Sequence, residues 1–297
     1  MPGQSDSATV TRFSPEKSSV PLKGLYLNQR LAEISAKIGR SLVITNYLTD
    51  RNGVIAKMDE NHSYQVPVEL KNKSDWRLFQ ELMAQADMVI SGSAYIKRFL
   101  ARGSRAEDVL FQFEPGKEYA KLGEWRLQAG YQRRSPDLAF VVRSLDFQFP
   151  DELVSSGRKI MIFTTYRMAN SSQARALTKM GVRVIGAGES GVDGNQMIDT
   201  LSELGYRVIM MATGPSVLDI LLKTQRLDLF YVSEVQRKIP YEDPASVITL
   251  LARGQKVDTL DEFSLFHQYL QERVVTEDGF QSSQLFLRYD YKGILAV

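Results

Sequence analysis

One segment of the sequence carries residue types that suit phosphate binding: Met211-Ala-Thr-Gly-Pro-Ser-Val-Leu218. Gly214 lets a ligand approach the backbone closely, and Pro215 suits the first position of a helix. Backbone amides at a helix N-terminus point outward, where the helix dipole favours an anion. The amides predicted to face a phosphate belong to Ser216, Val217 and Leu218. A tight strand-to-helix turn without a ligand fits the same residues, so both interpretations stand.

A second segment suits a phosphate monoester, because hydroxyls and a guanidinium follow a strand end. Thr164 and Thr165 come first, then Arg167, then the pair Ser171 and Ser172. Arginine offers the planar, bidentate donor that phosphate groups prefer, which makes Arg167 a candidate cofactor-binding residue. The alternative is a solvated loop whose hydroxyls only cap helices.

Two glycine-containing loops are further candidates. Residues 186–191 match the pattern GxGxxG, but residues 192–194 delay the next helix, so we interpret this run as a flexible loop at the sheet edge. Residues 89–95 end a strand at Ser91 and Gly92 and continue with small residues before a helix. This loop could let a pyrophosphate or a nicotinamide approach the backbone.

Composition narrows the chemistry that the chain can support. There is no cysteine, and the only histidines, His62 and His267, stand alone. Thiol catalysis, iron–sulfur clusters and cysteine-based zinc sites are therefore excluded, and no metal site is expected. The chain has 37 Lys and Arg against 35 Asp and Glu, so a strongly cationic nucleic-acid surface is not indicated. We expect no nucleic-acid partner, no membrane span, no secretory signal and a cytoplasmic location.

Hydrophobic periodicity predicts the elements that would position these loops. Short β-rich runs alternate with amphipathic helices, which is typical of an α/β fold with a mainly parallel central sheet flanked by helices. The predicted strands are residues 41–48, 88–91, 138–142, 159–163, 182–185, 206–212 and 229–233. The predicted helices are residues 25–38, 173–180, 196–204 and 217–223, and one more that Asp75 can cap, with Leu78, Leu82 and Met83 on its apolar face.

The two ends of the chain differ from this alternating middle. Residues 263–275 and 284–291 predict an antiparallel hairpin around Glu277-Asp-Gly279. Residues 1–20 are polar and predict a flexible N-terminal arm or an edge-covering extension. Residues 21–297 are then expected to form a single domain, with a polar insertion at residues 112–136.

The order of these motifs resembles the reductase domain of the bacterial riboflavin-pathway deaminase-reductases, which share the dihydrofolate reductase fold. The resemblance covers about residues 40–290. Its motifs are Asn46-Tyr-Leu-Thr-Asp-Arg-Asn-Gly53, Arg77 followed by Ala84-Gln-Ala-Asp-Met-Val-Ile-Ser-Gly92, the Thr164-Thr165 strand end and the Gly214 turn.

The resemblance implies an oxidoreductase that binds NADPH and transfers a hydride to a phosphoribosylamino-pyrimidine, a pteridine or a similar heterocyclic substrate. It implies a cofactor groove lined by Ser91, Gly92, Thr164, Thr165 and the residues from Gly214 to Leu218. It also implies that Asn46, Thr49 and Asn52 face the nicotinamide or the substrate.

The sequence departs from the family at two acidic positions. Asn52 stands where the family has aspartate, and Thr213-Gly-Pro215 replaces a Glu-Gly-Gly turn. Asp50 could compensate for the first change if it pointed inward. The lost carboxylates keep a second hypothesis open, that of a non-catalytic nucleotide-binding regulatory or interaction protein on the same fold.

The C-terminal strands hold more apolar side chains than one sheet face needs, so we expect a homodimer. Coverage of this surface by the N-terminal arm within one chain is the alternative. The side chains concerned are Phe263, Leu265, Phe266, Tyr269, Leu285, Phe286, Leu287 and Tyr289.

Overall fold

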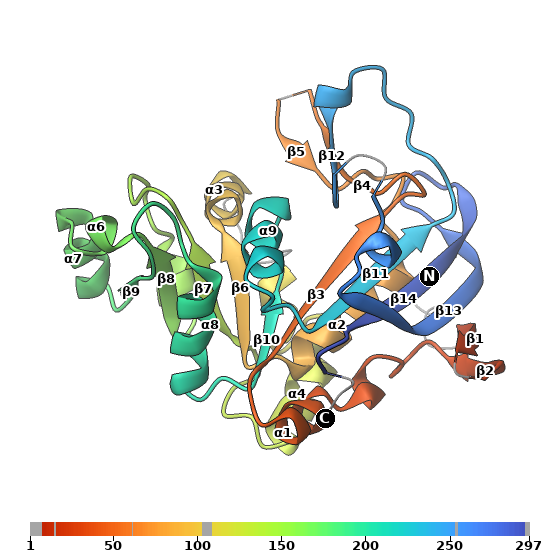
Figure 1. Cartoon of the computed structure of the whole chain (residues 1–297), viewed down its shortest axis with the longest axis horizontal. Coiled ribbons are helices and arrows are strands. Elements are labelled where there is room, and N and C mark those ends of the chain that lie inside the picture. The colour runs from red at the N-terminus through yellow and green to blue at the C-terminus, as the bar shows by residue number, and fades with distance from the viewer. Residues whose placement is uncertain (1–7, 15, 61, 103–108, 253–254, 295–297) are drawn as a thin grey trace. The chain divides into compact units, whose positions relative to one another are not determined.

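The structure of the chain is a computed structural model (Figure 1), in which residues 8–14, 16–60, 62–102, 109–252 and 255–294 are described. It divides into two compact units. The first unit is formed by the described residues within 1–29, 44–81 and 228–297, and the second by those within 30–43 and 82–227. The predicted α/β class is confirmed, because parallel strands flanked by helices and a C-terminal antiparallel hairpin are all present.

In the first unit, strands follow one another in the order β2-β1-β13-β14-β11-β3. The β11–β3 pair is parallel and the other pairs are antiparallel. The long β13–β14 pair is the hairpin that the sequence predicts. The bounds are β1 Thr9–Ser14, β2 Ser18–Pro21, β3 Leu42–Thr49, β11 Leu229–Val235, β13 Phe263–Val275 and β14 Gln281–Tyr291.

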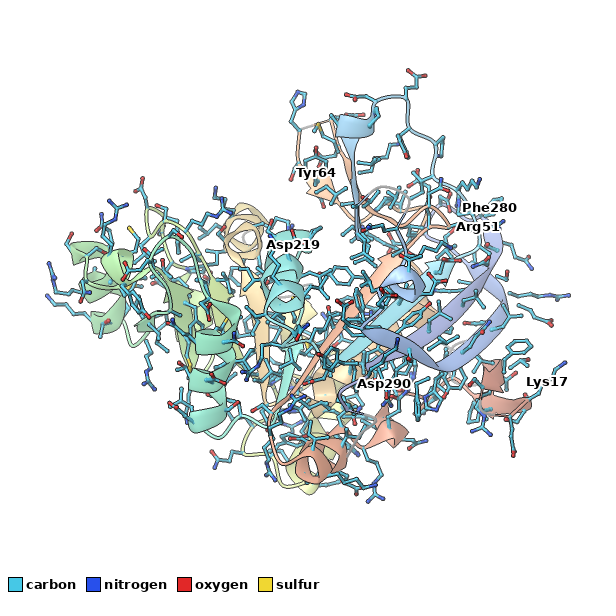
Figure 2. The ribbon with its side chains drawn as sticks, viewed as in Figure 1. Lys17, Arg51, Tyr64, Asp219, Phe280 and Asp290 are labelled. Carbon is cyan, nitrogen blue, oxygen red and sulfur yellow. The ribbon has the colours of Figure 1, made fainter. Side chains whose placement is uncertain are left out.

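A small antiparallel sheet in the first unit has the order β12-β4-β5. Val54, Leu70, Val235 and Ile239 form a fully buried cluster next to it. Figure 2 shows Tyr64 on this sheet, where its hydroxyl donates to the Ala245 carbonyl. The bounds are β4 Val54–Met58, β5 Tyr64–Gln65, β12 Val247–Thr249, the 3-10 turns η1 Leu27–Gln29, η3 Pro244–Ser246 and η4 Val257–Thr259, and helix α2 Lys73–Gln85.

In the second unit, five parallel strands follow the order β10-β6-β7-β8-β9. Helices α6 and α7 pack on β9, and α8 packs on α9 (Figure 1). The strands are β6 Met88–Gly92, β7 Asp137–Val141, β8 Ile160–Thr164, β9 Arg183–Gly186 and β10 Val208–Met211. The helices are α1 Leu31–Ile38, α3 Ser93–Arg102, η2 Val109–Phe111, α4 Ala120–Gln128, α5 Asp151–Val154, α6 Tyr166–Ala169, α7 Ser172–Lys179, α8 Gly194–Glu203 and α9 Pro215–Lys223.

Three regions gain detail over the sequence-based expectations. Residues 1–7 and 15 of the predicted arm lie outside the described residues. The rest of residues 1–20 includes β1 and part of β2, and β1 pairs with β13, as an edge-covering extension would. The predicted insertion at residues 112–136 contains helix α4.

The prediction that Asp75 caps a helix is wrong. Helix α2 begins at Lys73, and the residue before it, Asn72, accepts the Asp75 amide with its side chain at 2.9 Å. The Asn72 carbonyl also accepts the amide of Trp76. Asn72 therefore occupies the cap position, because it satisfies the first free amides of the helix. Asp75 lies one turn inside, and its side chain is available for another role.

Candidate active site

The Asp75 carboxyl is buried in the first unit, with only 8% of the residue exposed. Burial raises its pKa from the ordinary value of 3.8 to about 6, although the side chains of Ser233 and Asn46 lower it in part. A carboxyl with this pKa can hold or release a proton near neutral pH. Such perturbed groups are candidates for general acid–base work.

The strand register places Asn46 and Ser233 on one face of the sheet. Asn46 pairs with Tyr231 across β3 and β11, and Leu48 pairs with Ser233. Since side chains two residues apart point to the same face, Asn46 and Ser233 share that face. Among the described residues, Asp75 Oδ1, Asn46 Oδ1 and Ser233 Oγ are buried polar atoms with no hydrogen-bond partner of good geometry. Buried polar groups are rarely left unsatisfied in proteins, so these three atoms are available to a ligand or to water.

The four predicted catalytic residues are separated by the structure. Asn46 lies beside Asp75, whereas Thr49, three residues along β3, points to the opposite face. Asp50 is fully buried and uses both carboxylate oxygens on backbone amides: Oδ1 accepts Asn52 and Val54, and Oδ2 accepts Ile239. Asn52 itself lies in the exposed turn. Of the four, Asn46 alone contributes to the environment of Asp75.

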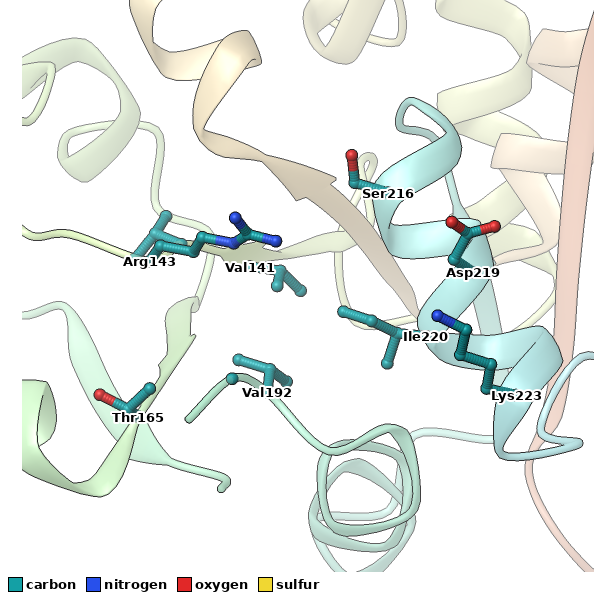
Figure 3. Close-up of a pocket in the computed structure, with 10 residues that line it drawn as sticks. Val141, Arg143, Thr165, Val192, Ser216, Asp219, Ile220 and Lys223 are labelled. Carbon is teal, nitrogen blue, oxygen red and sulfur yellow. The ribbon is translucent and has the colours of Figure 1, made fainter. Parts of the chain in front are cut away.

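The second unit contains a pocket of about 300 Å³, at the lower limit of the range of roughly 300–1,000 Å³ typical of small-molecule sites. Figure 3 shows Arg143 on the segment after β7, opposite Asp219 and Lys223 on α9. With two cationic groups and one carboxylate, the wall carries a formal charge of +1 at neutral pH. The lining residues are Val141, Val142, Arg143, Thr165, Gly191, Val192, Ser216, Asp219, Ile220 and Lys223.

The predicted Gly214 turn leads into this pocket. Gly214 is the residue before α9, and Pro215 is at the start of the helix, as predicted. Ser216 lines the pocket, whereas the Val217 and Leu218 side chains are buried in the core. The Val217 amide donates to the Gly214 carbonyl at 3.3 Å, so one of the three amides predicted for phosphate is already engaged within the turn.

Ser91 and Gly92, at the end of β6, lie next to the start of the same turn. Ser91 Oγ donates to the Ala212 carbonyl at 3.1 Å, which ties the end of β6 to the end of β10. A Cβ atom on Gly92 would lie 3.1 Å from Thr213 Oγ1. The glycine therefore allows the two strand ends to approach closely.

The two predicted threonines and Arg167 have different surroundings. Thr164 is fully buried, and its hydroxyl has no partner among the described residues. Thr165 lines the pocket and also caps α6 by accepting the Met168 amide at 3.3 Å. Arg167 is exposed on α6 and is not one of the residues that line the pocket.

The GxGxxG run follows β9, the last strand in the order, so its predicted place at the sheet edge is confirmed. The Gly188 carbonyl accepts the Tyr166 amide at 2.8 Å, and Gly191 lines the pocket. The GxGxxG run thus contributes one residue, Gly191, to the wall of the pocket. It is not the start of a helix, because α8 begins only at Gly194.

Two further kinds of feature are absent from the described residues. No group of three or more histidine, aspartate or glutamate side chains there could hold a metal ion. In the same residues, no helix is both long enough and apolar enough to cross a membrane.

Comparison with solved structures identifies the architecture. A pyrimidine reductase-like protein from Corynebacterium diphtheriae shares 19% identity with a TM-score of 0.58, over 88% of this chain and 98% of that one. The chain has the fold of the pyrimidine reductases. RibD from Acinetobacter baumannii shares 12% identity with a TM-score of 0.56, over 86% of this chain and 59% of RibD.

A deaminase/5-amino-6-(5-phosphoribosylamino)uracil reductase from Thermotoga maritima gives 11% identity and a TM-score of 0.53. The match covers 88% of this chain and 59% of the Thermotoga protein. This chain therefore spans less than two thirds of the length of RibD and of the Thermotoga protein. No protein-family profile and no curated protein sequence matches the chain.

Sequence reasoning missed Asp75 and the basic pair Arg143 and Lys223. Asp75 precedes Leu78 and Leu82 by three and seven residues, so it lies on the apolar stripe of its helix. An acidic side chain on a stripe that faces the core was the available signal. Arg143 comes two residues after β7, at a strand end of the kind where ligands bind in α/β folds.

Proposed function

We propose that this chain is an NADPH-dependent oxidoreductase that transfers a hydride to a heterocyclic substrate, of the phosphoribosylamino-pyrimidine type. The observation that carries the proposal is the buried Asp75 carboxyl beside Asn46 and Ser233, with its pKa raised to about 6. The fold shared with pyrimidine reductases supports the same class of reaction.

Asp75 would supply the proton that the reduction of a C=N bond requires. As the carbon receives hydride, the π electron pair moves to the nitrogen, and the O–H bond of Asp75 breaks to form N–H. A pKa near the working pH suits a group that gives up a proton and takes it back in each cycle. Asn46 Oδ1 and Ser233 Oγ lie beside this carboxyl and could orient the polar edge of a heterocycle.

The pocket of the second unit fits the phosphate groups of a dinucleotide. Arg143 and Lys223 supply positive charge, and Ser216 lies at the N-terminus of α9, where anions are stabilised. Gly214 has no other atom within 4 Å of the position that a Cβ would take, so a ligand can lie against the turn. When bound, the dihydronicotinamide of NADPH would supply the hydride.

The second candidate function is nucleotide binding without catalysis. Its specific support is the loss of family carboxylates at Asn52 and Thr213. The presence of Asp75 favours the oxidoreductase over the non-catalytic binding protein, because a proton donor on helix α2 does not depend on either lost carboxylate. We include in the proposal the cytoplasmic location and the homodimer expected from the sequence.

Titration with NADPH, followed by a screen of pyrimidine and pterin compounds for NADPH oxidation, tests the proposal. We expect submillimolar binding and turnover on at least one compound, with Asp75→Asn reducing kcat at least a hundredfold while NADPH affinity is unchanged. Tight NADPH binding without turnover on any compound would favour the binding protein. No NADPH binding would contradict the proposed NADPH-dependent oxidoreductase.

A further inference from the structure

Residues 22–29, which we name the N-terminal strap, precede the region of family resemblance and belong to the first unit. The strap is held by helix α2 through one carboxylate. Glu81 accepts the backbone amides of Gly24 at 2.7 Å, Tyr26 at 3.1 Å and Leu27 at 3.3 Å. Three amide donors on one buried carboxylate fix the position of a segment that has little regular structure of its own.

The strap is also tied to the sheet face that carries Asn46 and Ser233. The ring of Tyr26 packs on the ring of Tyr231 with a centroid distance of 4.9 Å, and Tyr231 is the cross-strand partner of Asn46. At the end of the strap, Gln29 Oε1 accepts the Tyr231 hydroxyl at 2.6 Å.

A second hydrogen bond holds the same Gln29 oxygen, from Arg288 Nη1 at 2.9 Å, and Arg288 forms a bidentate pair with Asp290. Figure 2 shows Asp290 among the packed side chains of the unit. The strap is therefore fixed at both ends, on α2 and on β14.

Tyr26 and Asp75 share the same surroundings, because the ring of Tyr26 packs on Tyr231, the cross-strand partner of Asn46, and Asn46 lies beside Asp75. Only 1% of Tyr26 is exposed, so burial is the main cause that raises the pKa of its hydroxyl, and the charges of Tyr231 and Asp75 raise this pKa further. The titratable groups that act on Tyr26 come from each neighbouring element: Tyr231 on β11, Asp75 and Glu81 on α2, and Tyr269 on β13. Arg77 faces Glu81 on α2, at 3.4 Å.

We propose that the N-terminal strap is a working part of the catalytic site, and that Tyr26 is a positioning residue that excludes water from Asp75 and so keeps its proton. This inference rests on the proposed function, since it assigns to Asp75 the proton that the substrate receives. Glu81 takes part indirectly, because it holds the strap and thereby holds Tyr26.

The test is an NMR titration of the Asp75 carboxyl in protein labelled with ¹³C-aspartate, with the signal assigned by its loss in Asp75→Asn. We expect Tyr26→Ala to lower the pKa of Asp75 by about one pH unit or more, because water would reach the carboxyl. Tyr26→Phe keeps the ring and should leave the pKa near that of the wild type. Glu81→Gln, which disturbs the strap and keeps Tyr26, should lower it.

Tyr47→Ala is the matched control, because Tyr47 is a buried tyrosine on β3 that points to the opposite face from Asn46. It should lower the melting temperature without changing the pKa of Asp75. An unchanged pKa in folded Tyr26→Ala, or an equal decrease in Tyr47→Ala, would overturn the inference. An absence of turnover by the wild type would contradict the proposed function alone, because the titration reads the strap without turnover.

Discussion

Asp75 and Asp50 are both buried aspartates of the first unit, but their oxygens are used in opposite ways. Asp50 accepts three backbone amides with its two oxygens, and it is fully buried. Asp75 Oδ1 has no hydrogen bond of good geometry among the described residues, and burial raises the Asp75 pKa to about 6 although the side chains of Ser233 and Asn46 lower it in part. Asp50 therefore stabilises a turn, whereas Asp75 is held at a cost in stability, as functional groups often are.

We predict that Asp75→Asn stabilises the protein at pH 8 and reduces kcat at least a hundredfold. A raised carboxyl pKa means that the folded state binds the proton more tightly than the unfolded state, so stability is lost as pH rises from about 4 to 6. A shift of about two pKa units corresponds to about 2–3 kcal/mol in the free energy of unfolding. The neutral amide introduced by Asp75→Asn would recover this loss. Urea unfolding should show that the variant has a higher free energy of unfolding than the wild type at pH 8 and nearly the same value at pH 4.

Asp50→Asn is the matched control for that experiment. Its amide group cannot accept the three backbone N–H groups as the carboxylate does, so we expect a loss of about 1–3 kcal/mol. A stabilised Asp50→Asn or a destabilised Asp75→Asn at pH 8 would show that the two roles are assigned wrongly.

Ser233→Ala should move the pH profile of turnover toward alkaline pH. The Ser233 side chain lowers the pKa of Asp75, so its removal raises that pKa further. A proton donor must be protonated, so kcat should fall above the pKa of Asp75 and the fall should begin at higher pH in the variant. Profiles of kcat from pH 5 to 9 check this, and a midpoint that moves to lower pH would contradict it.

Much of the fold could be predicted from the sequence, since the β-rich runs of β3, β6, β7, β8 and β11 alternate with amphipathic helices. The proton-donor site could not. Asp75 and Ser233 are 158 positions apart in the printed sequence, and only the tertiary structure brings the helix and the strand that carry them together. Local spacing also favoured a capping role for Asp75, because an aspartate near a helix start commonly caps it, and the competing cap Asn72 was overlooked.

Arg143 is predicted to bind the 2′-phosphate of NADPH. It lines the pocket, whereas Arg167, the residue favoured by sequence, is exposed and does not line it. Loss of a charge-assisted hydrogen bond of about 1.5–3 kcal/mol weakens binding roughly ten- to a hundredfold. Arg143→Ala should weaken NADPH binding by that factor and leave NADH binding nearly unchanged, as measured by fluorescence titration. If Arg167→Ala has this effect instead, the sequence-based assignment is correct.

The homodimer predicted from the sequence depends on few side chains. Most of the aromatic residues named for it are buried in the unit itself, but Leu265 and Phe266 are 44% and 41% exposed, and Phe13 on β1 is 42% exposed. Light scattering at micromolar concentration should give a mass of twice 33.6 kDa for the wild type. The double variant Leu265→Asp/Phe266→Asp should give half that mass, because the exposed apolar side chains are lost. A monomer mass for the wild type would contradict the prediction.

The Gly214 turn offers a direct test of phosphate binding. Gly214 has a φ of −74°, which any residue adopts, and no other atom lies within 4 Å of its would-be Cβ. The glycine is therefore not required by the backbone conformation, and Gly214→Val should cost at most about 1 kcal/mol as a poorer helix cap. If a pyrophosphate lies against this turn, the branched side chain fills its space, and NADPH affinity should fall at least a hundredfold.

Gly205→Val is the matched control, because Gly205 has a φ of +86°, also has open space around it, and lies outside the pocket. It should lose about 1–3 kcal/mol of stability and bind NADPH normally, since the left-handed region strains a branched residue. Normal NADPH binding by folded Gly214→Val would remove the turn from the cofactor site.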